Sequence, residues 1–220
     1  MKKKGGEEPK PLKVILLGES GVGKTSIILR YLNDQFDPAQ ESSNGLTYVE
    51  KNIKRNNITY KLNIWDTMGQ EKYHSMTKLF IKGADIVILV YSIDKEATFK
   101  VLDDWYQNFK DINDENVVLG IVGNKYDLFD NEEIQNEKVK DEDGEKYAKE
   151  KNAIFKLVSA KIDKKGIDSL FENLLDEYIN KKYEKEKNNN LKIGKNGKNK
   201  KKKCCWNFNY FKILVFIFLY

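Results

Sequence analysis

The chain has 220 residues, of which 33% are charged and 40% hydrophobic, and its formal net charge is +5. This length allows one domain of about 150–180 residues with terminal segments outside it. The charge is uneven, because residues 11–184 hold 25 Lys/Arg against 31 Asp/Glu, whereas residues 185–203 hold nine lysines and one glutamate. An acidic domain with a basic tail argues against nucleic acid as the partner and for an anionic membrane surface that the tail reaches.

The two ends of the chain differ in character. Residues 1–10 are charged and contain a proline, with no apolar stretch that could act as a secretion signal, so we expect a flexible tail. Cys204 and Cys205 are the only cysteines and adjoin the lysine tract. Adjacent cysteines of this kind do not indicate a structural disulfide, and a reduced, cytoplasmic compartment fits.

The first element with a chemical signature is a strand that turns into a helix. Apolar residues 14–17 precede the sequence GESGVGKT, and a helical pattern follows at residues 26–32. Glycines let backbone N–H groups turn toward a phosphate, the lysine reaches the β- and γ-phosphates, and the threonine hydroxyl can bind Mg²⁺. The start of the helix adds the positive end of its dipole. The nucleotide-binding residues predicted here are Glu19, Ser20, Gly21, Val22, Gly23, Lys24, Thr25 and Ser26.

The residue patterns of the next four segments predict strands. Residues 46–54 and 58–65 flank Asn56 and Asn57, which tolerate the positive φ of a tight hairpin turn. Residues 86–91 and 117–122 are continuous apolar runs, which are typical of strands covered on both faces.

Helical patterns alternate with these strands. Aromatic and aliphatic residues recur at helical spacing in residues 99–109 and 170–178. The alternation predicts an α/β fold with a mostly parallel sheet, helices around it and a ligand at the carboxyl ends of the strands. Beyond residue 183 the pattern fades into a segment too polar to form a core, which we interpret as a linker.

A second motif, DTMGQ, follows the strand that ends at Trp65. Asp66 at a strand end can hold Mg²⁺ through a water molecule. Gly69 can offer its N–H group to a γ-phosphate, and Gln70 can orient the attacking water. We therefore predict that Gln70, Lys24 and Gly69 carry the hydrolysis of a nucleoside triphosphate.

Two further motifs predict which base is bound. The apolar run at 117–122 is followed by Asn124, Lys125 and Asp127. The Asp127 carboxylate can accept from two adjacent N–H donors that guanine presents and adenine lacks. Ser159, Ala160 and Lys161 end the last strand, where a backbone N–H group can meet the guanine carbonyl. Four motifs in this order, each at a strand end, predict a guanine-nucleotide site.

With these motifs, residues 10–182 resemble the Ras superfamily of small GTPases. Residues 61–65, 80–84 and 89–94 resemble segments of the Rab family in particular. The resemblance implies a P-loop NTPase small G domain, with a six-stranded, mostly parallel sheet and helices on both faces. It implies four regions: a flexible tail at 1–10, the G domain at 11–183, a basic hypervariable linker at 184–203, and a Cys-Cys and apolar tail at 204–220.

The resemblance also assigns roles to individual residues. It implies that Phe36 packs on the guanine and that Ser43, with Thr25 and Asp66, forms the Mg²⁺ site. It further implies an aromatic cluster of Tyr48, Trp65 and Phe80 that is presented to effectors.

The function that the resemblance implies is a Rab-like switch in vesicle-mediated membrane traffic, which binds GTP or GDP with Mg²⁺ and hydrolyses GTP slowly. Neither of the two arginines, Arg30 and Arg55, is placed as an arginine finger, so rapid hydrolysis needs a GTPase-activating protein. Exchange factors, effectors and a GDP-dissociation inhibitor are the other implied partners. We expect a monomer at the surface of a vesicle membrane. Within the Rab family, the switch region favours an endosomal Rab.

There are two alternatives to the switch, and the first depends on departures from the Rab pattern. Met68 replaces a small residue beside the γ-phosphate, and Ser43 replaces a threonine, so the chain could be a GTP-locked binding module at a membrane. A P-loop kinase or ATPase is disfavoured by Asp127 and by the absence of an arginine cluster in the sequence.

The end of the chain has three interpretations. The lysine tract before Cys204 and Cys205 resembles a Rab tail that carries geranylgeranyl groups, but fifteen residues follow these cysteines. The apolar residues 208–220 are shorter than the roughly 20 residues that span a bilayer, so direct insertion would reach one leaflet only. We favour a third interpretation, in which residues 206–220 are not native and the chain ends at Cys205 with two lipids.

Overall fold

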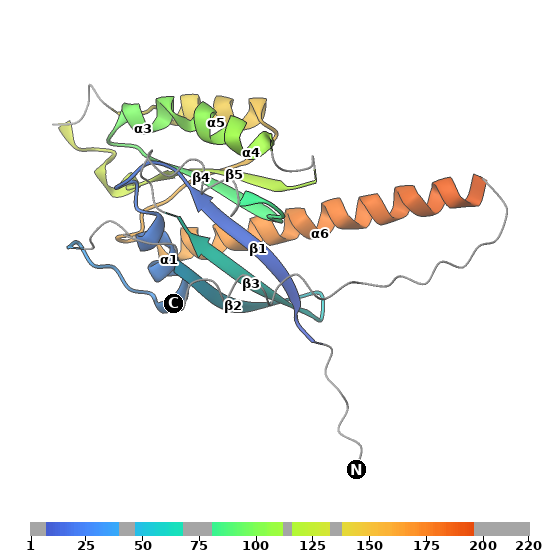
Figure 1. Ribbon diagram of the computed structural model, residues 1–220. Helices are drawn as coiled ribbons and strands as arrows, with labels where there is room; N and C mark the ends of the chain where they lie inside the picture. Colours follow the sequence, from blue (N-terminus) through green and yellow to red (C-terminus); the bar gives the residue numbers. More distant parts are fainter. Residues whose placement is uncertain (1–7, 40–46, 68–80, 112–115, 133–137, 196–220) are drawn as a thin grey trace, which may run out of the picture. The chain divides into compact units, whose positions relative to one another are not determined.

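The computed structural model describes residues 8–39, 47–67, 81–111, 116–132 and 138–195. Six strands form one sheet in the order β2-β3-β1-β4-β5-β6 (Figure 1). β2 and β3 pair antiparallel, and the other neighbouring strands pair parallel. The predicted α/β class and mostly parallel six-stranded sheet are confirmed. The strands are β1 (Lys10–Leu17), β2 (Thr47–Arg55), β3 (Ile58–Asp66), β4 (Ile86–Ser92), β5 (Val118–Asn124) and β6 (Ile154–Leu157).

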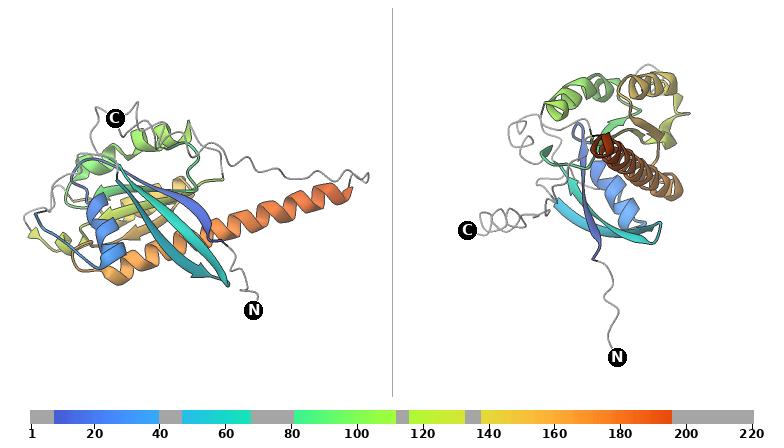
Figure 2. Two further views of the ribbon diagram at one scale, coloured as in Figure 1. Left: turned by 60° about the horizontal axis from the view of Figure 1, so that its bottom comes forward. Right: turned by 90° about the vertical axis from the view of Figure 1, so that its right-hand side faces the viewer.

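Helices cover both faces of this sheet, as Figures 1 and 2 show. Because side chains alternate along a strand, Val14 and Leu16 of β1 join a core with α1 and α6, whereas Ile15 and Leu17 join a second core with α4 and α5. Every residue of β4 and β5 is buried, as their apolar runs predict. The helices are α1 (Lys24–Asn33), α3 (Glu96–Lys100), α4 (Leu102–Lys110), α5 (Asp141–Glu150) and α6 (Lys164–Lys195), and η2 (Tyr126–Leu128) is a 3-10 turn.

The β2–β3 hairpin turns as its sequence predicts. Asn56 and Asn57 have φ angles of 49° and 62°, which asparagine tolerates better than most residues. On this hairpin the rings of Tyr48 and Trp65 lie 4.8 Å apart, and Tyr48 is 41% exposed. The hairpin therefore carries an exposed Tyr48 beside the partly buried Trp65, and these are two of the three residues predicted to face effectors.

Helix α6 runs further than its sequence pattern predicts. The helical pattern fades after residue 183, but the helix continues to Lys195. Lysine and glutamate are strong helix formers, so a polar segment can be helical without contributing to a core. By its contacts the chain forms two units, residues 1–182 and 183–220. Within the described ranges, none of the helices has both the length and the apolar character needed to cross a bilayer.

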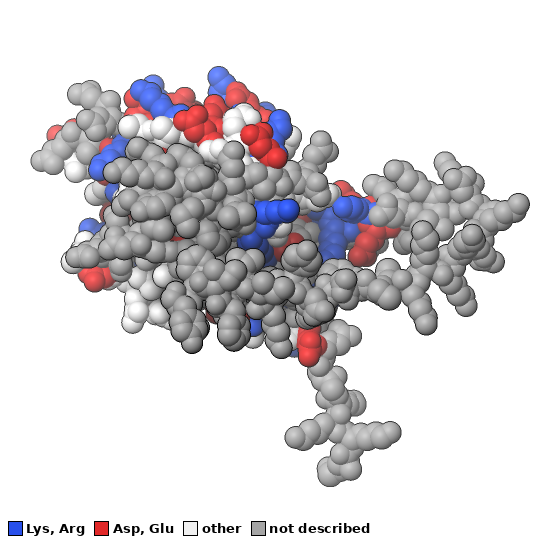
Figure 3. Space-filling model, viewed as in Figure 1, with Lys and Arg blue, Asp and Glu red and all other residues white. Residues whose placement is uncertain are grey.

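The surface above α3, α4 and α5 carries both signs of charge, as Figure 3 shows at the top of the view. Lys151 pairs with Asp103 at 2.8 Å, and Lys100 pairs with Glu96 at 2.6 Å. Interspersed charges of this kind are typical of a solvated surface.

Candidate nucleotide-binding site

The loop between β1 and α1 adopts a conformation that requires glycine at two positions. Gly18 has φ 143°, and a Cβ atom there would lie 2.1 Å from the Val90 carbonyl oxygen. Gly23 has φ 92° at the N-cap of α1, and a Cβ atom there would lie 2.3 Å from Asn124 Nδ2. Because these glycines bring the loop close to β4 and β5, the start of α1 lies at the carboxyl ends of the parallel strands.

Lys24 is the first residue of α1 and is only 6% exposed. Its Nζ donates to the carbonyl oxygens of Gly18 at 2.8 Å and Glu19 at 2.9 Å. Burial lowers the pKa of Lys24 to about 8, against the opposing effect of the Asp66 and Glu19 carboxylates. A buried ammonium group that donates to backbone carbonyl oxygens is well suited to receive an anion such as a phosphate.

Thr25 and Asp66 place two oxygen ligands beside the lysine. Thr25 Oγ1 donates to Asp66 Oδ2 at 2.6 Å, and Asp66 is buried. A hydroxyl and a carboxylate are the kind of ligands that Mg²⁺ takes alongside phosphate oxygens and water, so these residues fit the ion. The described ranges hold no cluster of three or more His, Cys, Asp or Glu side chains suited to a metal.

Asn124 joins two parts of the site. We call the part around Lys24 and Thr25 the phosphate end and the part around Asp127 the base end. Its side chain is buried, Nδ2 donates to the Val22 carbonyl at 2.8 Å, and Oδ1 accepts from the Ala160 N–H group at 3.1 Å. One amide group therefore holds the P-loop and the loop after β6 in a fixed relation.

The Asp127 carboxylate is held at the base end from two sides. Ser159 Oγ donates to Asp127 Oδ1 at 2.5 Å, and Lys161 Nζ lies 3.8 Å from Oδ2. The neighbouring Lys125 has a left-handed φ of 66°, and its Nζ lies 3.6 Å from an oxygen of Asp94. Asp127 is thus a fixed acceptor, as reading a base requires.

These residues surround a cavity of about 380 Å³, a size typical of small-molecule sites. Among the predicted residues that the structure describes, Glu19, Val22, Asp66 and Ser159 do not line it and instead support residues that do. The lining consists of Ser20, Gly21, Gly23, Lys24, Thr25, Ser26, Phe36, Asp37, Pro38, Thr67, Asn124, Lys125, Asp127, Leu128, Ala160 and Lys161.

Sequence reasoning missed four lining residues: Asp37, Pro38, Thr67 and Leu128. Each directly follows a predicted residue or another missed one, so adjacency to a motif was the available signal. It also missed Trp105 of α4, whose Nε1 donates to Glu19 Oε1 at 3.2 Å. The helical spacing of Trp105 with its apolar neighbours in the sequence indicates only that it is an aromatic residue of the core.

Several predicted residues lie outside the described ranges. They are Ser43 of the first switch, Met68, Gly69, Gln70 and Phe80 of the second switch region, and Cys204 and Cys205 of the tail. Their roles stay predictions.

Comparisons with known proteins agree with this geometry. The family model described as Ras family matches residues 13–180. The Ras-related protein Rab-22A of Homo sapiens is 39% identical over 150 residues, which are 68% of this chain and 75% of the relative. RABF2a of Arabidopsis thaliana is 39% identical over 149 residues, covering 68% and 72%, and human Rab-31 is 34% identical over 200 residues, covering 88% and 97%.

Proposed function

The chain belongs to the Rab branch of the Ras family, and from this premise we propose that it is a guanine-nucleotide switch that hydrolyses GTP and recruits effectors in vesicle-mediated membrane traffic. The observation that supports the proposal best is that one cavity joins the P-loop, with Lys24, to the fixed carboxylate of Asp127. The comparisons give no support to a GTP-locked module.

The residues of the phosphate end divide the work of binding. Lys24 would exchange its carbonyl partners for phosphate oxygens, and the N–H groups at the start of α1 would face the same phosphates. Thr25 and Asp66 would hold Mg²⁺ together with Ser43, and the ion would neutralise charge on the β- and γ-phosphates. Gly69 and Gln70 would contact the γ-phosphate and orient the attacking water.

The base end supplies selectivity. Asp127 would accept from the two guanine N–H donors, while Phe36, half-buried at the cavity wall, would pack on the ring. The backbone N–H group of Lys161 would reach the guanine carbonyl, beside Ala160, whose own N–H group donates to Asn124 Oδ1.

Thr25→Asn tests the metal site. We expect its affinity for GTP to fall at least tenfold in Mg²⁺ and to become nearly independent of Mg²⁺, because the substitution removes the hydroxyl ligand beside Asp66. Dissociation of a fluorescent GTP analogue with Mg²⁺ and with EDTA measures this, and the parent protein in EDTA is the control. Full Mg²⁺ dependence in the variant would refute the role of Thr25.

Met68→Ala tests whether the methionine limits hydrolysis. If Met68 crowds the attacking water, the variant hydrolyses GTP faster than the parent in single-turnover assays, and Gln70→Leu lowers whatever rate the parent has. A rate within about twofold of the parent, which is under roughly 0.5 kcal/mol of barrier, would show that Met68 points away from the reacting atoms.

Family membership implies an exchange factor, a GTPase-activating protein, effectors and a GDP-dissociation inhibitor as the general classes of partner. We propose that the exposed Tyr48, with the partly buried Trp65 beside it, forms part of the effector surface. We also propose peripheral attachment to an endosomal or other vesicle membrane through lipids on Cys204 and Cys205. Intact-mass spectrometry of the native protein tests this attachment: a chain that ends at Cys205 with two geranylgeranyl groups supports it, and an unmodified chain through Tyr220 that still pellets with membranes contradicts it.

A further inference from the structure

We propose that Arg30 is a positioning residue for guanine recognition, which holds the base-reading loop after β6 and joins it to the segment after α1 that carries Phe36. The inference rests on the proposed function, because it assumes that a guanine nucleotide occupies the cavity. Arg30 does not line that cavity, so any effect on the nucleotide must act through its neighbours.

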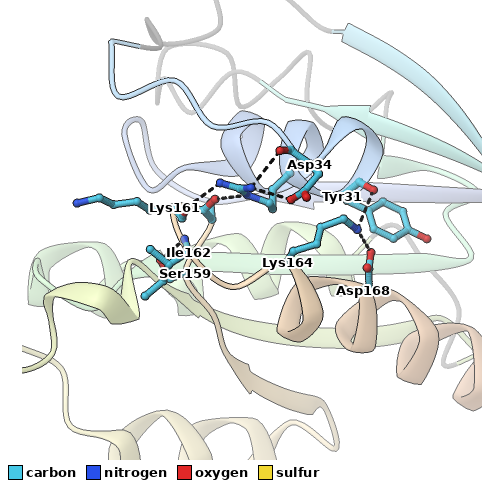
Figure 4. A network of polar contacts seen from close by, with 9 residues as sticks. Tyr31, Asp34, Ser159, Lys161, Ile162, Lys164 and Asp168 are labelled. Atoms are coloured by element: carbon cyan, nitrogen blue, oxygen red, sulfur yellow. Dashed lines mark hydrogen bonds and ion pairs between the residues drawn. The ribbon is translucent and has the colours of Figure 1, made fainter.

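The Arg30 side chain extends from α1 to the loop after β6, and only 14% of it is exposed. Nε donates to the Ala160 carbonyl at 2.8 Å, and Nη2 donates to the Lys161 carbonyl at 2.6 Å (Figure 4). The planar guanidinium presents its donors in a rigid fork, so it fixes the directions of two successive carbonyl groups more firmly than the single Nζ of a lysine would.

A chain of hydrogen bonds links these two contacts to Asp127. Since a trans peptide unit is planar, holding the Lys161 carbonyl also fixes the N–H group of Ile162, which donates to Ser159 Oγ at 3.3 Å. Ser159 Oγ in turn donates to Asp127 Oδ1 at 2.5 Å. The Ala160 carbonyl shares its peptide unit with the Lys161 N–H group, which must point the opposite way, away from Arg30.

The same guanidinium binds the residue that ends α1. Nη1 donates to Asp34 Oδ1 at 2.7 Å and to the Asp34 carbonyl at 3.1 Å. Asp34 is the C-cap of α1, with φ 56°, and stands two residues before Phe36 in the cavity wall. Arg30 therefore connects the side of the cavity that carries Phe36 with the side that carries Ala160 and Lys161. Release of the base should be slower while these two sides are joined.

A purely structural role for Arg30 is the alternative. An arginine in the last turn stabilises a helix through its dipole. However, α1 has other anchors on α6, because the rings of Tyr31 and Phe171 stack at 3.8 Å and Lys164 contacts the Tyr31 carbonyl at 3.5 Å. The helix should therefore stay packed without Arg30, and the two roles can be separated by experiment.

The experiment measures dissociation of a fluorescent GDP analogue from the full chain in Mg²⁺. We expect Arg30→Gln to release it about tenfold faster or more, because charge-assisted hydrogen bonds to two carbonyls are lost. Arg30→Lys keeps the charge but not the fork and should fall between the parent and Arg30→Gln. Arg55→Gln is the matched control. Arg55 is likewise an arginine with polar partners on another element, Glu172 at 2.9 Å and Asp176 at 3.1 Å, but it lies on the β2–β3 hairpin and does not line the cavity. Arg55→Gln should change the rate less than twofold.

A second readout separates positioning from stability. The ratio of GDP to ADP affinity, measured by competition, should fall in Arg30→Gln, because the loop that reads the base is no longer held. A lower Tm with unchanged dissociation rate and unchanged ratio would overturn the inference. If Arg30→Gln does not fold, the same two measurements on Arg30→Lys decide. A parent protein that does not bind the GDP analogue would instead contradict the proposed function.

Discussion

Asp127→Asn is expected to lose at least about 100-fold in affinity for GTP and GDP and to gain binding of xanthine nucleotides. The carboxylate accepts from two adjacent N–H donors of guanine, whereas an amide offers one acceptor and one donor. Xanthine carries a carbonyl where guanine has its amino group, so the substitution restores a matched pair with that base. Competition between guanine and xanthine nucleotides for the variant measures the exchange.

The structure suggests that Asp127→Asn leaves the fold intact. Ser159 Oγ donates to Asp127 Oδ1 at 2.5 Å, and an asparagine oxygen can accept the same hydrogen bond. The thermal unfolding of the variant without nucleotide should therefore resemble that of the parent. Equal affinity for GTP in parent and variant would refute the assignment of Asp127 to the base.

Lys24→Met is the second substitution with a large expected effect. It should lower nucleotide affinity without a matching loss of stability. We expect GDP affinity to fall about 100-fold or more, since the only buried cation of the described phosphate end is removed. Stability without nucleotide should change little. The loss of hydrogen bonds to Gly18 and Glu19 is offset by the removal of a buried charge. Thermal unfolding with and without GDP measures both effects, and a GDP-induced rise in Tm equal to that of the parent would contradict the role of Lys24.

The pH dependence of stability offers a check on the same residue. Burial lowers the pKa of Lys24 from 10.5 to about 8, so between these pH values the unfolded chain binds more protons here than the folded chain. The cost of burying the ammonium group is therefore present below pH 8 and is relieved as the pH rises toward 10.5. Relative to the parent, Lys24→Met should lose stability across this window. A difference in unfolding free energy that is constant with pH would contradict a buried, titrating Lys24.

Much of the sheet and the cavity could be predicted because their signals are local. The all-apolar runs of β4 and β5 can only be covered on both faces, and the four motifs follow strands whose carboxyl ends meet at one edge of a parallel sheet. The length of α6 could not be predicted in this way. Low apolar content shows that a segment lacks a core-facing surface, but Lys and Glu favour a helix regardless.

The supports of the site lay beyond sequence reasoning for a different reason. Arg30 reaches a carbonyl 130 residues away, and Trp105 reaches Glu19 across 86 residues. Both contacts depend on how helices pack on the sheet, and the backbone carbonyl group that accepts from Arg30 carries no residue identity. From the sequence alone, an arginine in the last turn of a helix is therefore interpreted as a solvated charge. Its role becomes visible only in the fold, where the loop after β6 packs beside it.

The most direct test of the guanine-nucleotide switch is the nucleotide that the purified protein carries. Protein isolated in Mg²⁺ is denatured, and the released nucleotide is identified and quantified by chromatography. We predict close to one guanine nucleotide per chain, with added GTP converted to GDP over time. Adenine nucleotide in its place, or a folded protein that carries no nucleotide and takes up neither GDP nor GTP when these are added, would contradict the account.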